Sequence, residues 1–195
     1  VNSCYNQMFS GCNKLNSITM LATDISATYC LNNWVSGVAS TGTFVKAPSM
    51  TSLTTGTSGI PSGWTKKNNL NYLNLTALGN GTITITIPAQ VDSSVATSLS
   101  YSKNKSKWTD TAINSNEQII TIQVSSGENV YFKGIANQLG NKSTGVNINS
   151  TTNINASGNI MSLLYGDNFN AKTSFPNGSQ YTFDKLFRDS THLIN

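Results

Sequence analysis

The side chains that could perform acid–base or nucleophilic chemistry are few and scattered along this chain. His192 is the single histidine, so it is the only imidazole that could activate a serine, threonine or cysteine. It stands in a recurring apolar motif, which indicates a packing or solvent-facing role. Glycoside hydrolysis needs two carboxyl groups about 5 to 10 Å apart, and none of the eight acidic residues has a spacing that recommends a pair. The sequence therefore predicts that the protein is not an enzyme.

The three cysteines, Cys4, Cys12 and Cys30, do not form a metal-binding pattern. Their odd number excludes complete internal pairing, and no Cys-x-x-Cys is present. His192 is distant in sequence, so a zinc site has little support. Phosphate-binding and calcium-binding loops are also absent, and we expect no metal and no cofactor. Because a free cysteine behaves as a small hydrophobe, buried thiols are expected. A disulfide from Cys30 to Cys4 or Cys12 is the alternative.

A basic segment flanked by aromatic residues is the candidate ligand-binding site. It comprises Tyr101, Lys103, Lys105, Lys107 and Trp108. Aromatic faces stack on apolar ring faces, and lysines attract anionic groups, so the segment could bind a sugar ring or an acidic glycan. Lysines at a hairpin tip also keep a sheet edge soluble, and a tryptophan after such a tip is often a core residue. The segment could therefore have a structural role instead of a ligand-binding role.

A motif near the start of the chain returns near its other end. The segment Cys4–Leu15, CYNQMFSGCNKL, aligns with Thr182–Leu193, TFDKLFRDSTHL, at a constant offset of 178 residues (182 minus 4). In both copies an aromatic residue precedes a phenylalanine by four positions, and a leucine follows the phenylalanine by six. A unit of this kind needs stacked neighbours to bury its apolar face. The residues assigned to the repeat are Cys4, Met8, Phe9, Cys12, Leu15, Leu186, Phe187 and Leu193.

These residues resemble the BspA-type leucine-rich repeats of Bacteroidetes surface proteins, in which C-x-x-x-x-M-F-x-x-C-x-x-L precedes a ladder of Ile or Leu. The segment Ala22–Thr65 looks like the closing part of such an array, and Asn159–Phe169 looks like the lead-in to another. The second copy departs from the pattern, with Thr182 and Ser190 in place of the cysteines. The resemblance implies a short helical turn around 6–9 and 184–187, on the convex side of the array.

Composition fits a β-rich protein with polar turns. Only 10% of the residues are charged, well below the ~25% of typical domains, whereas Asn, Ser, Thr and Gly are abundant. The net charge of +4 arises mostly from scarce acids, so nucleic acid is not an expected partner. No apolar run reaches the length of about 18 residues that indicates a membrane span, and Val1 does not begin a signal peptide. We therefore expect no direct membrane insertion of this segment.

The centre of the chain predicts an antiparallel β-sandwich. Thr82–Ile87 alternates threonine and isoleucine, so Ile83, Ile85 and Ile87 should face a core. The alternating residues 73–77 should pair with it across the turn at Gly79–Gly81. Further strands are expected at 99–101, 120–124 and 130–133, whereas 136–157 could form irregular strands or a loop. The predicted fold class is mainly β: a sandwich at 66–158, the end of a repeat array at 1–65, and the first unit of a further array at 159–195.

Two short triplets, beginning at Asp110 and Asp189, resemble the O-glycosylation acceptor of Bacteroidetes. The resemblance implies that Thr111 and Ser190 could carry sugar.

The function that the resemblance implies is a non-catalytic adhesion or recognition module at the cell surface or in the secreted fraction. Its expected partners are glycans or proteins of a host or a neighbouring cell, together with adjacent repeat domains of the same polypeptide. Tandem display would make many weak contacts strong. A structural spacer between repeat arrays is one alternative. A bacteriophage fibre or capsid decoration protein on the virion surface is the other.

Overall fold

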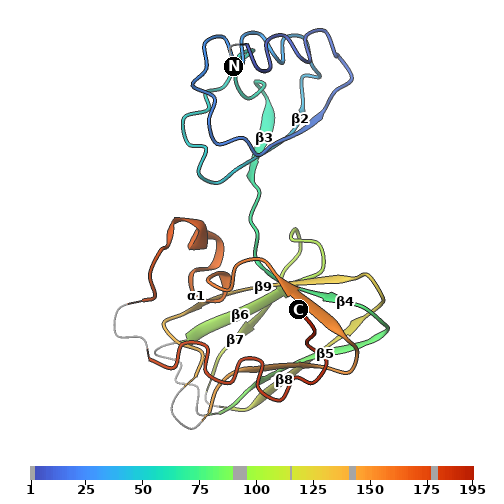
Figure 1. Cartoon of the computed structure of the whole chain (residues 1–195), viewed down its shortest axis with the longest axis vertical. Coiled ribbons are helices and arrows are strands. Elements are labelled where there is room, and N and C mark those ends of the chain that lie inside the picture. The colour runs from blue at the N-terminus through green and yellow to red at the C-terminus, as the bar shows by residue number, and fades with distance from the viewer. Residues whose placement is uncertain (1–2, 90–95, 115, 141–143, 177–179) are drawn as a thin grey trace. The chain divides into compact units, whose positions relative to one another are not determined.

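The protein is mainly β and divides into two compact units. The computed structural model describes residues 3–89, 96–114, 116–140, 144–176 and 180–195 (Figure 1). Among the described residues, strands account for 37% and helices for 6%. Unit 1 spans Val1–Leu70 and unit 2 spans Asn71–Asn195. The boundary lies five residues after the expected position at 65 (70 minus 65). The segment 159–195 shares the core of unit 2 and does not form a unit of its own.

Unit 1 is built on a parallel three-stranded sheet with the order β1-β2-β3. The strands are β1 (Ser17–Met20), β2 (Gly42–Lys46) and β3 (Trp64–Asn68). Ser17 is in register with Thr43, an offset of 26 residues (43 minus 17). Parallel neighbours need a crossover connection, and in unit 1 each crossover consists largely of turns.

The connection between β1 and β2 contains an unusual backbone form, which we call a turn ribbon. In a turn ribbon every fourth residue has a positive φ, and alternate N–H groups donate to the carbonyl three residues earlier. Three segments have this form, at 3–12, 29–38 and 181–190. Their positive-φ residues are Ser3, Gln7 and Gly11 in the first, Tyr29, Asn33 and Gly37 in the second, and Tyr181, Lys185 and Asp189 in the third. The first and third ribbons are the two copies of the sequence repeat, so the repeat has a shared conformation. That conformation is a series of turns, and the expectation of helical turns is wrong.

The first two ribbons stack on each other through backbone hydrogen bonds. The N–H groups of Tyr5, Gln7 and Phe9 donate to the carbonyls of Cys30, Asn32 and Trp34 at 2.8 to 2.9 Å. Ser3 and Gly11 continue the row onto Thr28 and Ser36. The stack brings Tyr5 and Phe9 against Trp34, with ring centroids 6.2 and 6.0 Å apart. Trp34 in turn contacts the fully buried Phe44 of β2, so the ribbons and the sheet enclose one core.

The cysteines of unit 1 differ from the expectation. Cys30 is buried, but Cys4 and Cys12 are exposed, so the prediction of buried thiols is wrong for these two. None of the three forms a disulfide in the described structure. Cys30 packs in the core beside Leu31 and Trp34, whereas the side chains of Cys4 and Cys12 lie on the surface of the first ribbon. Burial and a hydrogen bond with Cys4 raise the pKa of Cys30.

Unit 2 consists of two antiparallel sheets around one core, a sandwich-like arrangement (Figure 1). The smaller sheet has the order β10-β5-β8, formed by Asn147–Ser150, Gly81–Ile87 and Gln118–Val124. The larger has the order β11-β4-β9-β6-β7, formed by Ile154–Ser157, Leu73–Ala77, Asn129–Ala136, Ala96–Ser102 and Thr109–Ala112. Helix α1 (Ser162–Tyr165) and the 3-10 helix η1 (Gly166–Ala171) follow β11.

Alternation in the sequence identifies the buried face of the strands. Ile83, Ile85 and Ile87 are completely buried, as predicted. The predicted pairing of 73–77 with 82–87 is wrong, because β4 and β5 lie in different sheets. The turn at Gly79–Gly81 therefore carries the chain from one sheet to the other. The residues 136–157, which the sequence left undecided, include β10 and β11.

The third turn ribbon and the residues that follow it run beside two of the edge strands, β10 and β11. The N–H of Ile148 in β10 donates to the carbonyl of Leu186, and the N–H of Ile154 in β11 donates to that of His192. Leu186 is buried, and Phe183, Phe187 and Leu193 pack against the same core. This segment thus covers the edges of β10 and β11, which would otherwise present unpaired backbone N–H and C=O groups.

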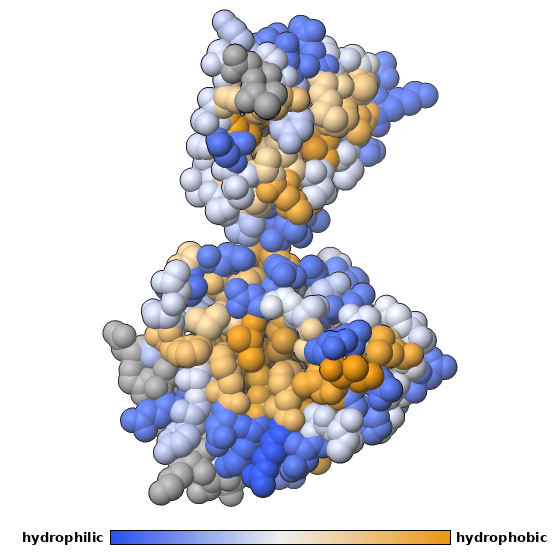
Figure 2. Space-filling view, in the orientation of Figure 1, coloured by the Kyte–Doolittle hydropathy of each residue, from blue (hydrophilic) through white to orange (hydrophobic). Residues whose placement is uncertain are grey.

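The surface of unit 2 has a region of concentrated apolar side chains. Figure 2 shows them as a band over the visible face, bordered by hydrophilic side chains. In the described part of the chain, no helix has the length and apolar character needed to cross a membrane.

Candidate functional site

A groove on unit 2 with both polar and apolar lining residues is the candidate functional site. It has a volume of about 470 Å³ and is lined by strands β6, β7 and β9 and by the junction of α1 with η1. Because Leu99 of β6 faces the core, its neighbours Ser98 and Ser100 face the groove. Strand pairing places Asp110 and Lys133 on either side of Ser100. Tyr165, Asp167 and Asn168 complete the wall.

Helix α1 is held beside β9 by a glycine and a buried serine. A Cβ atom on Gly134 would lie 2.6 Å from the carbonyl oxygen of Leu163, so only glycine permits this close approach. The Ser162 hydroxyl donates to the carbonyl of Phe132 at 2.8 Å and accepts from the N–H of Leu73 at 3.0 Å. Ser162 is completely buried. These contacts position the α1–η1 junction, and with it one wall of the groove.

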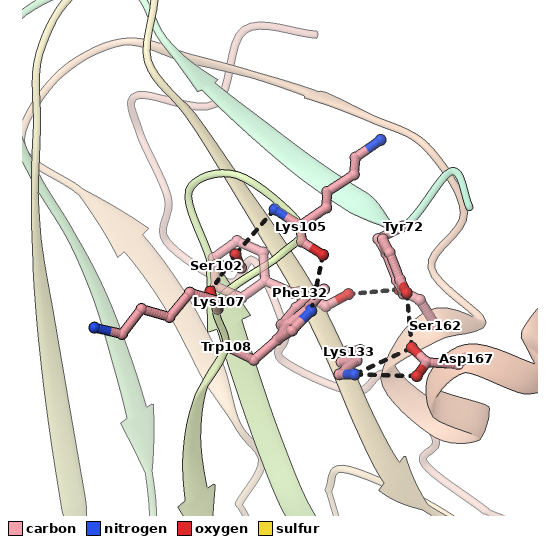
Figure 3. A network of polar contacts seen from close by, with 9 residues as sticks. All are labelled: Tyr72, Ser102, Lys105, Lys107, Trp108, Phe132, Lys133, Ser162 and Asp167. Carbon is pink, nitrogen blue, oxygen red and sulfur yellow. Dashed lines mark hydrogen bonds and ion pairs between the residues drawn. The ribbon is translucent and has the colours of Figure 1, made fainter. Parts of the chain in front are cut away.

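Lys133 links the groove to an aromatic pair, the buried Tyr72 and the half-buried Trp108 (Figure 3). Its ammonium group lies 3.1 Å from a carboxylate oxygen of Asp167 and 4.4 Å from the ring centroid of Trp108. The same carboxylate accepts a hydrogen bond of 2.7 Å from the Tyr72 hydroxyl. Tyr72 packs edge-on against Trp108 at 4.9 Å. Burial, together with the hydrogen bond to Asp167, raises the pKa of Tyr72 well above its usual value. The network fixes Lys133 and Asp167 at the rim of the groove.

The groove offers groups that suit a neutral polar ligand. The hydroxyls of Ser98 and Ser100 can donate and accept, the carboxylates of Asp110 and Asp167 can accept, and the ammonium of Lys133 can donate. The Tyr165 ring and the exposed side chain of Ile135 add apolar surface. A sugar presents hydroxyls at its edge and C–H groups on its faces, and this mixture matches that combination. Among the described residues, no cluster of His, Cys, Asp and Glu could hold a metal ion.

The predicted basic segment forms the β6–β7 hairpin, but its lysines point in different directions. Lys103 pairs with Glu128 at 2.9 Å, which holds the pKa of Glu128 below its usual value. Lys105 lies over the ring of Tyr131 at 4.5 Å, and burial lowers its pKa. Figure 3 shows Lys107 pointing away from Trp108 and Lys133. The structure therefore does not gather these lysines into one patch.

The aromatic residues flanking the hairpin are less accessible than a stacking platform would be. Trp108 is half-buried between Tyr72 and Lys133, and its indole N–H donates to the carbonyl of Lys105 at 3.3 Å. Tyr101 packs against the core of unit 2. A ligand-binding role for Tyr101, Lys103, Lys105, Lys107 and Trp108 remains a prediction.

The predicted glycosylation residues lie in different surroundings. Thr111 is on the edge strand β7 and is half-buried. The hydroxyl oxygen of Ser190 is buried and has no hydrogen-bond partner in the described structure. Attachment of a sugar to Ser190 would require local opening, and Thr111 is in register with the core-facing Leu99. His192 is half-buried beside the exposed hydroxyl of Thr191 at 3.3 Å.

Sequence reasoning missed the residues that build the groove. Lys133 and Asp167 are 34 positions apart, and Tyr72 and Asp167 are 95 apart. No spacing rule connects such positions. The one available signal was the alternation of serines around Leu99, which placed a polar face on β6 opposite its buried face.

Comparisons with protein-family models, with curated proteins and with solved structures find no match.

Proposed function

We propose that this protein is a non-catalytic recognition module that binds carbohydrate in the groove of unit 2. The observation that carries the proposal is the fixed arrangement of Lys133 and Asp167 beside Tyr165 and two groove-lining serines, Ser98 and the 5% exposed Ser100. These donors and acceptors converge on one concave surface, whereas the lysines of the predicted hairpin diverge. Binding sites for small ligands typically combine concave shape with a few placed polar groups.

The charge balance of the groove favours neutral or weakly charged glycans. Two carboxylates, from Asp110 and Asp167, face one ammonium from Lys133, and this ammonium is already paired. A strongly acidic polysaccharide would meet a net negative lining. The volume of about 470 Å³ lies within the ~300–1,000 Å³ range of ligand pockets.

We further propose that unit 1 and the third turn ribbon are parts of BspA-like leucine-rich-repeat arrays in a cell-surface or secreted protein. Support comes from the parallel sheet, the 26-residue offset between β1 and β2, and the turn ribbon that both sequence copies share. In this view the arrays display the groove in multiple copies. Weak single contacts with host or neighbouring-cell glycans then add up to firm adhesion.

Two alternatives predict different behaviour. A spacer between repeat arrays would contact only its neighbours, and the groove would bind no sugar. A phage fibre or capsid decoration protein would be found in purified virions. The groove favours the adhesion module over the spacer, because a spacer has no need of converging polar groups on its outer face.

The test is the binding of a multivalent form of the chain to an array of mucin-type glycans, acidic polysaccharides and matrix proteins. A groove variant, Asp110→Ala with Asn168→Ala, changes two exposed lining residues. A hairpin variant, Lys107→Ala, is the matched surface control. The proposal predicts saturable binding to neutral glycans that the groove variant loses and the hairpin variant keeps. No binding to any member of the array, or loss of binding only in the hairpin variant, would contradict the proposal.

A further inference from the structure

We propose that the groove of unit 2 prefers a sugar unit with a free amino group, bound as an ammonium by the Asp110 carboxylate and the Ser100 hydroxyl. This preference rests on the proposed carbohydrate function and names the class of sugar that the site takes. The charge of the lining is the first observation that supports it. Asp110 and Asp167 carry two negative charges and Lys133 carries one positive charge, so the lining has a net charge of −1 (one minus two). An ammonium on the ligand would balance this charge.

The two carboxylates of the groove differ in their partners. That of Asp167 accepts a hydrogen bond of 2.7 Å from the Tyr72 hydroxyl and one of 3.1 Å from Lys133. The Lys133 ammonium also lies 4.4 Å from the ring centroid of Trp108. The carboxylate of Asp110, in contrast, forms no ion pair or hydrogen bond with a residue that the structure describes. The positive charge of the groove is therefore held by Asp167, and the Asp110 carboxylate is the group left for a ligand.

Ser100 supplies a second polar group beside Asp110. The two residues are direct cross-strand partners in β6 and β7, which places their Cβ atoms about 4.5 to 5.5 Å apart. Ser100 lines the groove and is only 5% exposed, yet its hydroxyl has no hydrogen-bond partner among the described residues. Because an unpaired buried hydroxyl is costly, a ligand that pairs with it is favoured. An ammonium has three donors, so it can donate to the carboxylate and to the hydroxyl together.

The apolar wall of the groove suits the ring of a sugar. Ile135, which is 60% exposed, lines the groove and forms a β-bridge with Tyr165. The Tyr165 hydroxyl donates to the carbonyl of Ser174 at 3.0 Å, which fixes the ring. The Lys172 ammonium lies 5.1 Å from the centroid of this ring, but Lys172 does not line the groove. The groove thus offers apolar surface to the C–H groups of a sugar and a carboxylate–hydroxyl pair to its amine.

The net charge of the chain makes such a preference local to the groove. The chain carries a charge of +4, so a cationic oligosaccharide is not attracted to the molecule as a whole. Asp110 is exposed to solvent, so dissolved salt screens its attraction for an ammonium. Tighter binding of an amino sugar that weakens as salt is added would therefore report on the carboxylate of the groove.

The experiment is titration calorimetry of the full chain with three β-1,4-linked tetrasaccharides at about pH 6, where amines are protonated. The tetrasaccharides consist of glucosamine, N-acetylglucosamine or glucose, which differ only in having an ammonium, an acetamido group or a hydroxyl at C2. We expect the glucosamine tetrasaccharide to bind at least about fivefold more tightly than the other two. The difference should shrink in about 0.5 M NaCl.

Two charge-neutralising variants complete the experiment. Asp110→Asn keeps the shape of the side chain but removes its charge, so it should abolish the difference between the amino sugar and the other two. The matched control is Glu117→Gln, which removes an exposed carboxylate outside the groove lining and should keep the difference.

The outcomes separate this preference from the carbohydrate function on which it rests. Equal affinities of the three tetrasaccharides in the wild type, or the same difference in Asp110→Asn, would overturn the preference and leave a carbohydrate site in place. A lysine peptide that binds the groove as tightly as the amino sugar would also overturn it. Absence of binding by all three tetrasaccharides would overturn both the preference and the carbohydrate function.

Discussion

Lys133 is the residue on which the candidate site depends most. It contacts the carboxylate of Asp167 and the ring of Trp108 at the same time. Its side chain is only 20% exposed, whereas that of Asp167 is 58% exposed. Screening by water limits such an ion pair to about 1 kcal/mol or less, and a cation–π contact adds about 0.5 to 1 kcal/mol. The value of Lys133 to the site therefore lies in orientation more than in stability.

Replacing Lys133 with methionine should separate these two contributions. The variant keeps the length of the side chain but loses the charge, so we expect the free energy of unfolding to fall by about 1 kcal/mol. Glycan affinity should fall by about tenfold or more, which corresponds to about 1.4 kcal/mol. Urea denaturation and titration calorimetry measure the two effects. Lys107→Met is the control, and equal losses in both variants would contradict the assigned role.

Tyr72 makes the stability of unit 2 depend on alkaline pH. Its folded-state pKa is raised by burial and by Asp167, so the unfolded phenol, with its usual value of 10.0, loses its proton first as pH rises. The stabilising contribution is complete below about pH 10 and declines above it. The free energy of unfolding should therefore fall more steeply in wild type than in Tyr72→Phe between about pH 9 and about pH 11. If the free energy of unfolding changed with pH in the same way in wild type and in Tyr72→Phe, Tyr72 would not be held in its neutral form.

Contacts between individual side chains are the feature that the sequence predicted least well. The lysines at 103, 105 and 107 lie close in sequence, and this proximity suggested one basic patch. Lys103 pairs with Glu128, Lys105 covers Tyr131, and Lys107 points away from Trp108 and Lys133 (Figure 3). Lys133 and Asp167 meet only because α1 lies beside β9. Such contacts depend on the tertiary fold and leave no local pattern.

At the scale of elements, Ser162 connects α1 to two strands. Its hydroxyl bridges the Leu73 N–H and the Phe132 carbonyl in the fully buried interior. Ser162→Ala leaves a buried donor without a partner, which costs about 1 to 3 kcal/mol. Because α1 positions Tyr165 and Asp167, glycan affinity should fall as well. Thermal unfolding and glycan titration check both effects, with Ser125→Ala in an exposed turn as the control. Unchanged affinity in a destabilised variant would show that the groove does not depend on α1.

Strands could be predicted from the sequence much better than their pairing. The alternation in 82–87 places three isoleucines in the core, because strand side chains point to opposite faces. It does not indicate which strand lies alongside. Gly79–Gly81 suits a hairpin turn, yet β5 pairs with β8 and β10 instead of β4. Packing of the whole sandwich determines which strands pair with β5. The repeat motif, likewise, predicted that two distant segments share a conformation, but not that this conformation is a turn ribbon.

At the scale of the whole molecule, each unit has its own core. Phe44 is completely buried in the core of unit 1, and Ile85 is completely buried in that of unit 2. Truncating either side chain to alanine should cost about 2 to 5 kcal/mol. We expect Phe44→Ala to lower the transition reported by Trp34 and Trp64 fluorescence, and Ile85→Ala to lower the one reported by Trp108. Calorimetry in which both variants shift one common transition would contradict two separate cores.

The central claim is that the groove of unit 2 recognises carbohydrate. The most direct measurement is a titration of the isotope-labelled chain with mucin-type and acidic oligosaccharides, followed by amide chemical shifts in NMR spectra. We expect saturable changes in the amide chemical shifts of Ser100, Lys133, Gly134 and Asp167, with little change at Asn104–Lys107 in the hairpin tip. Shifts concentrated in the tip, or no shifts with any oligosaccharide, would contradict it.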